Sequence, residues 1–167
     1  METINMDKMI KDIKKVQKDG FIYLATPYTA HPGGFETSYQ QSSRIAGWLV
    51  SKGVMVFCPI AHTHPIGLYG GLDPVDSDNI WMPLDLPFMK AAKALVVAQL
   101  PGWSKSKGID IEICTFKKDK KKVFFLDPSL IDSEILSANN TLCTKLKNGN
   151  PSNSRTGFKN FIYSTII

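Results

Sequence analysis

The feature that most constrains this fold is a series of four short apolar segments, each followed by a turn-forming residue. They span residues 21–26, 54–58, 94–100 and 122–126. Short apolar runs of this kind are typical of strands buried on both faces. Strands that alternate with helices favour a parallel sheet covered by helices on both faces. We therefore expect an α/β, Rossmann-like fold with about four to five strands.

The segments between these strands suit amphipathic helices, because their apolar residues can form one buried stripe. We expect helices over residues 5–18, 37–52, 79–93 and 108–118, and a short helix over residues 127–136. Residues 60–80 are rich in Gly, Pro, Asp and His, and they predict a long loop. A loop of that length in a compact domain is usually functional or mobile.

The length of 167 residues favours one main domain. We place it at residues 1–137, because residues 138–154 are polar and weakly patterned. Residues 158–167 return to an apolar composition. Two interpretations of residues 138–167 stay open. They form either a polar linker with a docking tail, for example an edge or interface strand, or a partly disordered end.

The formal charge of +5 comes largely from lysines near residues 11–18 and 117–122. Such runs can attract phosphate or nucleic acid, but most are solvated helix ends. No aromatic residues interleave with the run at 117–122, so a platform for stacking bases is not indicated. We therefore expect no nucleic-acid partner.

The three cysteines are Cys58, Cys114 and Cys143, and no pair has the spacing CxxC. This pattern favours neither a disulfide framework nor a zinc site, and we expect a reduced, cytoplasmic protein. The lysine-rich start lacks the apolar run of a signal peptide. No segment approaches the roughly 20 apolar residues of a membrane span, so no membrane partner is expected.

The junction between the third predicted strand and the following helix carries the residues of an anion site. Ser104, Ser106 and Gly108 can hold an anion against free N–H groups at the positive helix end. Glu112 follows one turn later among isoleucines, and its spacing allows it to face the same crevice. Burial would raise the pKa of Glu112. The alternative is a solvent-facing Glu that pairs with a lysine.

Other candidate side chains lie near the ends of the predicted strands. Asp85 stands alone between two prolines, which suits a buried acid, a helix N-cap, or both. His62 and His64 lack the spacing of a zinc site, so we expect no metal and favour a role in lining a nucleotide pocket. Tyr23 and Tyr28 suit either core packing or the positioning of a carboxylate.

Three common motifs are absent from the sequence. No G-x-G-x-x-G follows the first predicted strand, and no G-x-x-x-x-G-K-[ST] loop is present. The sequence thus indicates neither a standard dinucleotide site nor a P-loop, and we expect no cofactor. The nucleophile elbow G-x-S-x-G is also missing.

Four segments within residues 20–127 carry a family resemblance. They read Ile22-Tyr-Leu-Ala-Thr-Pro-Tyr28, Val56-Phe-Cys-Pro-Ile-Ala-His62, Trp81-Met-Pro-Leu-Asp85 and Ser106-Lys-Gly-Ile-Asp-Ile-Glu112. In this order they resemble the nucleoside 2-deoxyribosyltransferase superfamily, and more specifically a phage and bacterial branch of the DUF1937 type. The resemblance implies a flavodoxin-like parallel sheet, assembly as a homo-oligomer, and an enzyme. The implied reaction breaks the N-glycosidic bond between a base and a ribose or deoxyribose, by hydrolysis or by transfer.

The resemblance also implies roles for individual residues. Glu112 would be the nucleophile at the anomeric carbon, Tyr23 would orient it through a hydrogen bond, and Asp85 would handle the base or the proton on it. Ser106 stands where superfamily hydrolases of nucleotide monophosphates carry Ser and nucleoside transferases tend to carry Asp. That favours a nucleoside 5′-monophosphate as substrate and water as acceptor. The other expected substrate contacts are Thr26, Pro27, Tyr28, His62, His64, Trp81, Trp103, Ser104 and Gly108.

Two departures from the superfamily pattern keep other functions open. Thr26 stands where Gly is common, and the segment 60–80 is unusual. One alternative is a non-catalytic protein that binds or sequesters a nucleotide, for example of phage origin. A DNA-binding accessory protein that uses the lysine runs is the least favoured hypothesis.

Overall fold

The computed structural model describes residues 6–131. The expectations for residues 132–167, including the boundary after residue 137 and the apolar tail, lie outside the described residues. Within the described part of the chain, no helix is both long enough and apolar enough to span a bilayer.

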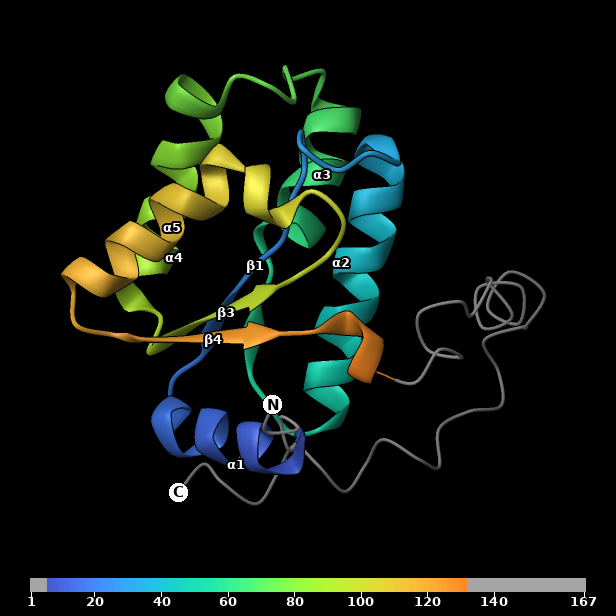
Figure 1. The fold of residues 1–167 in the computed structure, drawn as a ribbon. Coiled ribbons are helices and arrows are strands. Elements are labelled where there is room, and N and C mark those ends of the chain that lie inside the picture. The colour runs from blue at the N-terminus through green and yellow to red at the C-terminus, as the bar shows by residue number, and fades with distance from the viewer. Residues whose placement is uncertain (1–5, 132–167) are drawn as a thin grey trace, which may run out of the picture. The chain divides into compact units, whose positions relative to one another are not determined.

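Four parallel strands form the centre of the fold (Figure 1). The strands are β1 (Ile22–Ala25), β2 (Val56–Phe57), β3 (Ala94–Ala98) and β4 (Lys122–Leu126). Their order in the sheet is β2-β1-β3-β4. The central strands β1 and β3 are buried along their whole length, whereas the edge strands β2 and β4 are partly exposed. The predicted α/β class and parallel sheet are thereby confirmed.

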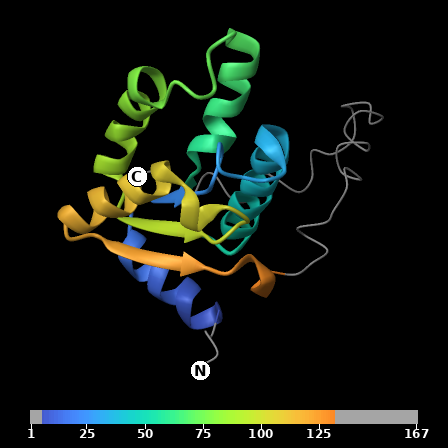
Figure 2. The ribbon, with the colours of Figure 1, turned by 45° about the horizontal axis from the view of Figure 1, so that its top comes forward.

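Helices cover both faces of the sheet (Figure 2). The helices that do so are α1 (Met6–Gln17), α2 (Gly34–Ser51), α4 (Met82–Ala91) and α5 (Lys107–Lys118). Alternate side chains of a strand point to opposite faces, so β1 contributes side chains to the hydrophobic cores on both faces of the sheet. Leu24 packs in the core formed with α1 and α2. Tyr23 packs in the core formed with α4 and α5, which places its side chain on the same face as α5.

The winding of the chain reverses between β1 and β3. From β1 the chain moves outward through α2 to β2, then crosses back to β3 on the other side of β1 and continues to β4. Ligands of doubly wound sheets bind beyond the carboxyl ends of the strands, at such a switch point. The segments that follow Ala25 and Ala98 therefore flank the expected ligand crevice.

Residues 60–80 do not form the long loop that their composition predicts. They contain most of helix α3 (Pro59–Gly70) and a π-helical turn, η1 (Ser77–Trp81). Pro59 occupies the start of α3, where its missing N–H is not needed. Gly71 ends the helix with a φ of 66°, a conformation that favours glycine. The composition predicted a loop, but Pro59, Gly70 and Gly71 stand at the ends of α3, where such residues are accepted, and the helix tolerates Pro65 and Gly67 in its interior.

The other expected helices are present with shifted ends. Helix α2 begins at Gly34 rather than at residue 37. Helix α4 begins at Met82 rather than at residue 79, because the preceding residues form η1. Of the short helix expected over residues 127–136, the described part contains a single 3₁₀ turn, η3 (Pro128–Leu130).

Candidate functional site

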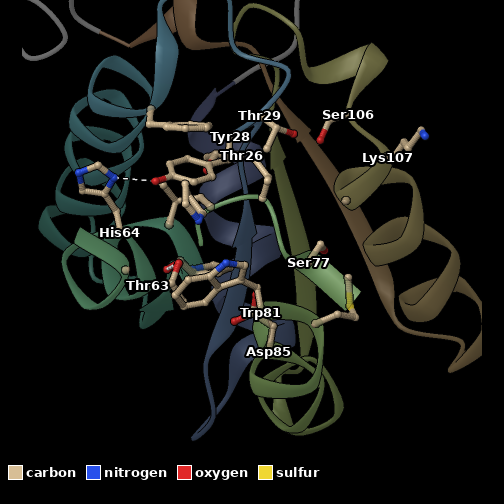
Figure 3. A pocket seen from close by; sticks show the side chains of 18 of the residues that line it. Thr26, Tyr28, Thr29, Thr63, His64, Ser77, Trp81, Asp85, Ser106 and Lys107 are labelled. Carbon is tan, nitrogen blue, oxygen red and sulfur yellow. Dashed lines mark hydrogen bonds between the residues drawn. The ribbon is translucent and has the colours of Figure 1, made fainter. Parts of the chain in front are cut away.

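A pocket of about 640 Å³ lies beyond the carboxyl ends of β1 and β3 (Figure 3). Its walls come from the loop after β1, from α3, from residues 71–82 and from the start of α5. Small-molecule pockets typically measure about 300–1,000 Å³. The pocket therefore has room for a ligand of nucleotide size, at the place where the sheet topology predicts one.

Tyr23 and Glu112 are joined by a hydrogen bond at the wall of this pocket. The hydroxyl of Tyr23, on β1, donates to Oε1 of Glu112, on α5, over 2.9 Å. Tyr23 is fully buried, and its ring packs against Phe57 and Phe116. Since a close-packed ring cannot shift without disturbing its neighbours, Tyr23 holds the carboxyl group of Glu112 in one orientation. The contact that the sequence resemblance implied is thereby confirmed.

Asp85 brings a second carboxyl group into the same pocket. It lies in the first turn of α4 and is only 9% exposed. The N-cap of α4 is Trp81 and not Asp85, so the capping interpretation of Asp85 is wrong. Its Oδ1 is buried without a hydrogen-bond partner among the described residues. A buried oxygen without a donor is costly, and a ligand that brings a donor would remove that cost.

Burial in this pocket raises the pKa of both carboxyl groups. The pKa of Asp85 rises to about 7 and that of Glu112 to about 8, mainly because burial disfavours their charged forms. The hydroxyl of Tyr23 opposes the rise at both groups. Burial and the charge of Glu112 raise the pKa of Tyr23 itself, so its phenol remains a proton donor. Both carboxyl groups therefore gain or lose a proton near neutral pH.

The start of α5 adds groups that favour an anion. Ser106 is the N-cap of α5, and its Oγ accepts a hydrogen bond from the N–H of Ile109 at 3.4 Å. Ser106, Lys107 and Gly108 all line the pocket. Because a helix N-terminus carries partial positive charge, this end of the pocket suits a phosphate or a carboxylate.

A second polar cluster lies across the pocket, on the side of α3. The hydroxyl of Tyr28 is 2.8 Å from Nδ1 of His64, and both residues line the pocket (Figure 3). The ring of Tyr28 stacks on Phe35, with 4.7 Å between the ring centroids. The ring of His64 stacks on Tyr39 at 4.4 Å. Packing of both rings fixes the geometry of this hydrogen bond.

The pocket brings together most of the residues that the sequence predicted for the site. Tyr23 stands behind Glu112, in hydrogen-bonding contact with it. The predicted residues that line the pocket are Thr26, Tyr28, His64, Trp81, Asp85, Ser106, Gly108 and Glu112. Their roles in chemistry or binding stay predictions.

Four predicted contacts are not part of the pocket lining, namely Pro27, His62, Trp103 and Ser104. His62 contacts the rings of Phe57 and Phe88 instead. Residues two apart on a helix point in different directions, so His62 and His64 cannot share one site on α3. Trp103 packs against Phe125 of β4. Sequence proximity to the strand ends did not reveal these directions.

Sequence reasoning missed several residues of the wall that α3 contributes. Pro59, Thr63 and Gly67 all line the pocket, and all three are buried. They stand four residues apart, which is the spacing of one helix face. That spacing is a signal available in the sequence, but the composition of residues 60–80 predicts a loop and conceals it. Phe35 and Lys107 were also missed, although they adjoin predicted elements.

Within residues 6–131, no three His, Cys, Asp or Glu side chains are grouped so that they could hold a metal ion. Of the cysteines that the structure describes, Cys58 is buried and Cys114 is exposed, and both are free.

Comparison with protein-family models assigns the chain to a family. Residues 20–127 match the model of the domain of unknown function DUF1937, which covers well over half of the 167 residues. The chain belongs to the DUF1937 family. The DUF1937 region runs from just before β1 to the end of β4, and so includes every pocket residue described above. No curated protein matches the chain.

Proposed function

We propose that this DUF1937 protein is a nucleotide N-glycosidase that hydrolyses the bond between the base and the sugar of a nucleoside 5′-monophosphate. The observation that carries the proposal is the Tyr23–Glu112 hydrogen bond of 2.9 Å at the wall of a pocket that also holds the buried carboxyl group of Asp85. Two carboxyl groups in one pocket supply a nucleophile and a proton donor, which is what glycosidic-bond cleavage requires.

In the first step of the proposed reaction, the ionised carboxylate of Glu112 attacks C1′ of the sugar. The bond between C1′ and the base nitrogen breaks, and its electron pair leaves with the base. Asp85 transfers its proton to the departing base, which leaves as a neutral molecule. The sugar is then esterified to Glu112. The negative charge of Glu112 also stabilises the positive charge that develops on the sugar ring.

In the second step, a water molecule attacks C1′ and gives its proton to the ionised carboxylate of Asp85. The ester bond breaks, and its electron pair returns to Glu112. The products are free base and ribose 5-phosphate or its deoxy form. Because Asp85 donates a proton in the first step and accepts one in the second, a pKa near neutrality suits it.

The start of α5 supports a 5′-phosphate as part of the substrate. Ser106 offers a hydroxyl, Lys107 a positive charge and Gly108 an unobstructed backbone at the positive end of the helix. The four sequence segments that resemble the nucleoside 2-deoxyribosyltransferase superfamily support the same reaction class. We infer that DUF1937 is a branch of that superfamily in which water, rather than a second base, is the acceptor.

The test is incubation of the full chain with a panel of ribo- and deoxyribonucleoside 5′-monophosphates. Chromatography measures free base and sugar phosphate. We expect base release by the unchanged chain and a loss of at least about 10³-fold in Glu112→Gln. The matched control is Asp110→Asn, which makes the same carboxyl-to-amide change at an exposed position on the same helix. It should keep the unchanged rate.

Two results would overturn the proposed activity. The first is the absence of base release from every nucleotide of the panel. The second is equal base release by the unchanged chain and by Glu112→Gln. If a nucleotide binds tightly but is recovered intact, the alternative of a nucleotide-binding or sequestering protein replaces the hydrolase.

A further inference from the structure

Glu36, His64 and Tyr28 form a chain of polar contacts that runs from the surface into the pocket. The side chain of Glu36, on α2, is 63% exposed, and its Oε2 lies 3.2 Å from Nε2 of His64. On the other side of the ring, Nδ1 of His64 lies 2.8 Å from the hydroxyl of Tyr28. Glu36 itself does not line the pocket, whereas His64 and Tyr28 do. The mechanism above uses none of these three residues.

The position of Glu36 decides which nitrogen of His64 carries the proton. Nε2 of His64 is buried and makes no aligned hydrogen bond with a described residue, but Oε2 of Glu36 lies only 3.2 Å from it. The negative charge of this carboxylate attracts an N–H at that position and repels a bare lone pair. The proton of a neutral His64 therefore resides on Nε2, and Nδ1 becomes an acceptor. The Tyr28 hydroxyl then donates to Nδ1.

Tyr28 consequently presents an acceptor to the pocket. Burial and the charge of Glu36 raise the pKa of Tyr28, so its phenol keeps its single proton. That proton is directed to His64, and the oxygen retains lone pairs that are free for a ligand. A ligand group that meets this oxygen must be a hydrogen-bond donor, because a second acceptor would repel it.

The surroundings of Tyr28 identify the part of a nucleotide that would lie there. Glu112 and the start of α5 supply groups that suit a sugar and a phosphate. At Tyr28 the lining offers an aromatic surface, because Phe35 stacks on its ring, and Thr26 and Thr29 lie beside it (Figure 3). Leu68, Leu72 and Trp81 add further apolar surface to the pocket wall. Flat, apolar faces of this kind suit a base, since bases stack on aromatic side chains.

We propose that Tyr28, polarised by His64 and Glu36, selects nucleotides whose base carries an exocyclic amino group, as adenine and cytosine do. This inference rests on the proposed function, because it assumes a nucleotide in the pocket. The amino group projects from the base edge away from the sugar and donates to the oxygen of Tyr28. A keto group at the same position, as in hypoxanthine and uracil, would present a second acceptor to that oxygen.

The test measures binding in the Glu112→Gln background, where turnover does not consume the ligand. The probes are two matched pairs at pH 8, AMP with IMP and CMP with UMP, and calorimetry gives each Kd. We expect the amino member of at least one pair to bind about tenfold more tightly, the effect of one hydrogen bond. Tyr28→Phe should bring that ratio close to one. Tyr69→Phe, at a tyrosine that is 87% exposed and outside the pocket lining, should leave the ratio unchanged.

Glu36→Gln gives a second readout that loss of packing at the pocket would not produce. Nε2 of Gln40 donates to Oε1 of Glu36 over 2.7 Å. In Glu36→Gln this donor holds the new amide oxygen and turns the amide NH₂ toward Nε2 of His64. His64 then carries its proton on Nδ1 and donates to Tyr28, whose hydroxyl is released to donate to the ligand. We expect Glu36→Gln to prefer the amino member less strongly than the chain that retains Glu36, and to bind the keto member more tightly than that chain does.

The outcomes separate this inference from the proposed function. If none of the four nucleotides binds, both the proposed function and this inference are overturned. If nucleotides bind but the amino and keto members bind equally, the inference alone is overturned. The same holds if the preference survives in both Tyr28→Phe and Glu36→Gln. Should Tyr28→Phe fail to fold, the ratio of the Kd values of the amino and keto nucleotides in Glu36→Gln, a variant at an exposed position, still tests the inference.

Discussion

The hydroxyl of Tyr23 is the single donor that connects β1 to the carboxyl group of Glu112. Its removal in Tyr23→Phe would leave the aromatic packing in place and free the carboxyl group to turn. A hydrogen bond to a charged group contributes about 1.5–3 kcal/mol, so kcat should fall roughly 10- to 100-fold. Steady-state base release measures this change. An unchanged kcat would show that Tyr23 is only a core residue.

The raised pKa of Glu112 makes a prediction about stability. Burial raises this pKa from 4.5 to about 8 in the folded chain. Below pH 4.5 the group is protonated in both states, and between pH 4.5 and 8 the unfolded chain ionises first. Glu112 therefore lowers the free energy of unfolding as pH rises through that window.

Glu112→Gln removes the pH-dependent destabilisation that the buried carboxyl group causes. Relative to the unchanged chain, the variant should gain stability progressively from pH 4.5 to pH 8 and should show little further gain above pH 8. Urea unfolding at a series of pH values measures the difference. Asp110→Asn serves as the exposed control on the same helix. A difference that does not vary with pH would contradict the raised pKa.

Individual side chains differ in how far the sequence revealed them. Glu112 and Asp85 were recognisable because a lone carboxyl group in an apolar segment is unusual, and the pairing of Tyr23 with Glu112 followed from the family resemblance. The pairing of Tyr28 with His64 was not predictable, because it joins residues 36 positions apart on a loop and a helix. The prediction that His62 and Trp103 contact the substrate is not supported, because their side chains do not line the pocket and pack against other aromatic rings.

At the scale of elements, the loop after β1 and the loop after β3 meet at Gly102. Gly102 has a φ of 92°, and a Cβ there would overlap the carbonyl oxygen of Ala30. Both the conformation and the contact require glycine. Gly102→Ala should therefore push apart the two loops that lead into the pocket. We expect a loss of about 1–3 kcal/mol of stability together with a raised KM.

Gly47→Ala is the control for this substitution. Gly47 lies within α2, and a Cβ there would meet nothing within 4 Å. In a helix the change from Gly to Ala should stabilise the chain by about 0.5–1 kcal/mol and leave KM unchanged. Thermal unfolding and steady-state kinetics of both variants measure the contrast. Equal behaviour of the two variants would show that the two loops do not position the site.

The strands were the elements most accessible to sequence reasoning. β1 and β3 are short, wholly apolar and closed by a loop, and these features come from burial in the centre of a parallel sheet. The segment 60–80 was not accessible in the same way. Its Pro and Gly residues usually break a helix, so composition alone predicted a loop; in α3, Gly70 and Gly71 stand at the C-terminal end, and Pro65 and Gly67 are accommodated inside.

At the scale of the whole molecule, the sheet brings together the end of β1 and two helices from distant parts of the chain. The proposed reaction uses Glu112 ionised and Asp85 protonated, so the pair holds one proton. Because the pKa of Glu112 lies above that of Asp85, this is the less populated of the two one-proton forms, and the reaction proceeds through that minor form. Base release should therefore fall at low pH, as Glu112 takes up a proton, and at high pH, as Asp85 loses one. The pKa values of about 7 for Asp85 and about 8 for Glu112 place the maximum rate between pH 7 and pH 8.

Asp85→Asn should alter the shape of that pH profile. The variant keeps Glu112 but cannot give a proton to the base, so the fall at high pH should disappear and the maximal rate should drop about 10²- to 10⁴-fold. A profile measured from pH 5 to pH 10 for both proteins makes the comparison. A variant profile with the same two limbs would exclude Asp85 as the proton donor.

The most direct test of the account is the mass of the chain quenched during turnover of a nucleotide. Attack by Glu112 on C1′ predicts a population heavier by the sugar phosphate portion of the substrate, with the added mass on the peptide that carries Glu112. That population should be absent from Glu112→Gln and present in Asp110→Asn. An adduct on a different side chain, or base release by Glu112→Gln at the rate of the unchanged chain, would contradict a glutamate nucleophile held by Tyr23.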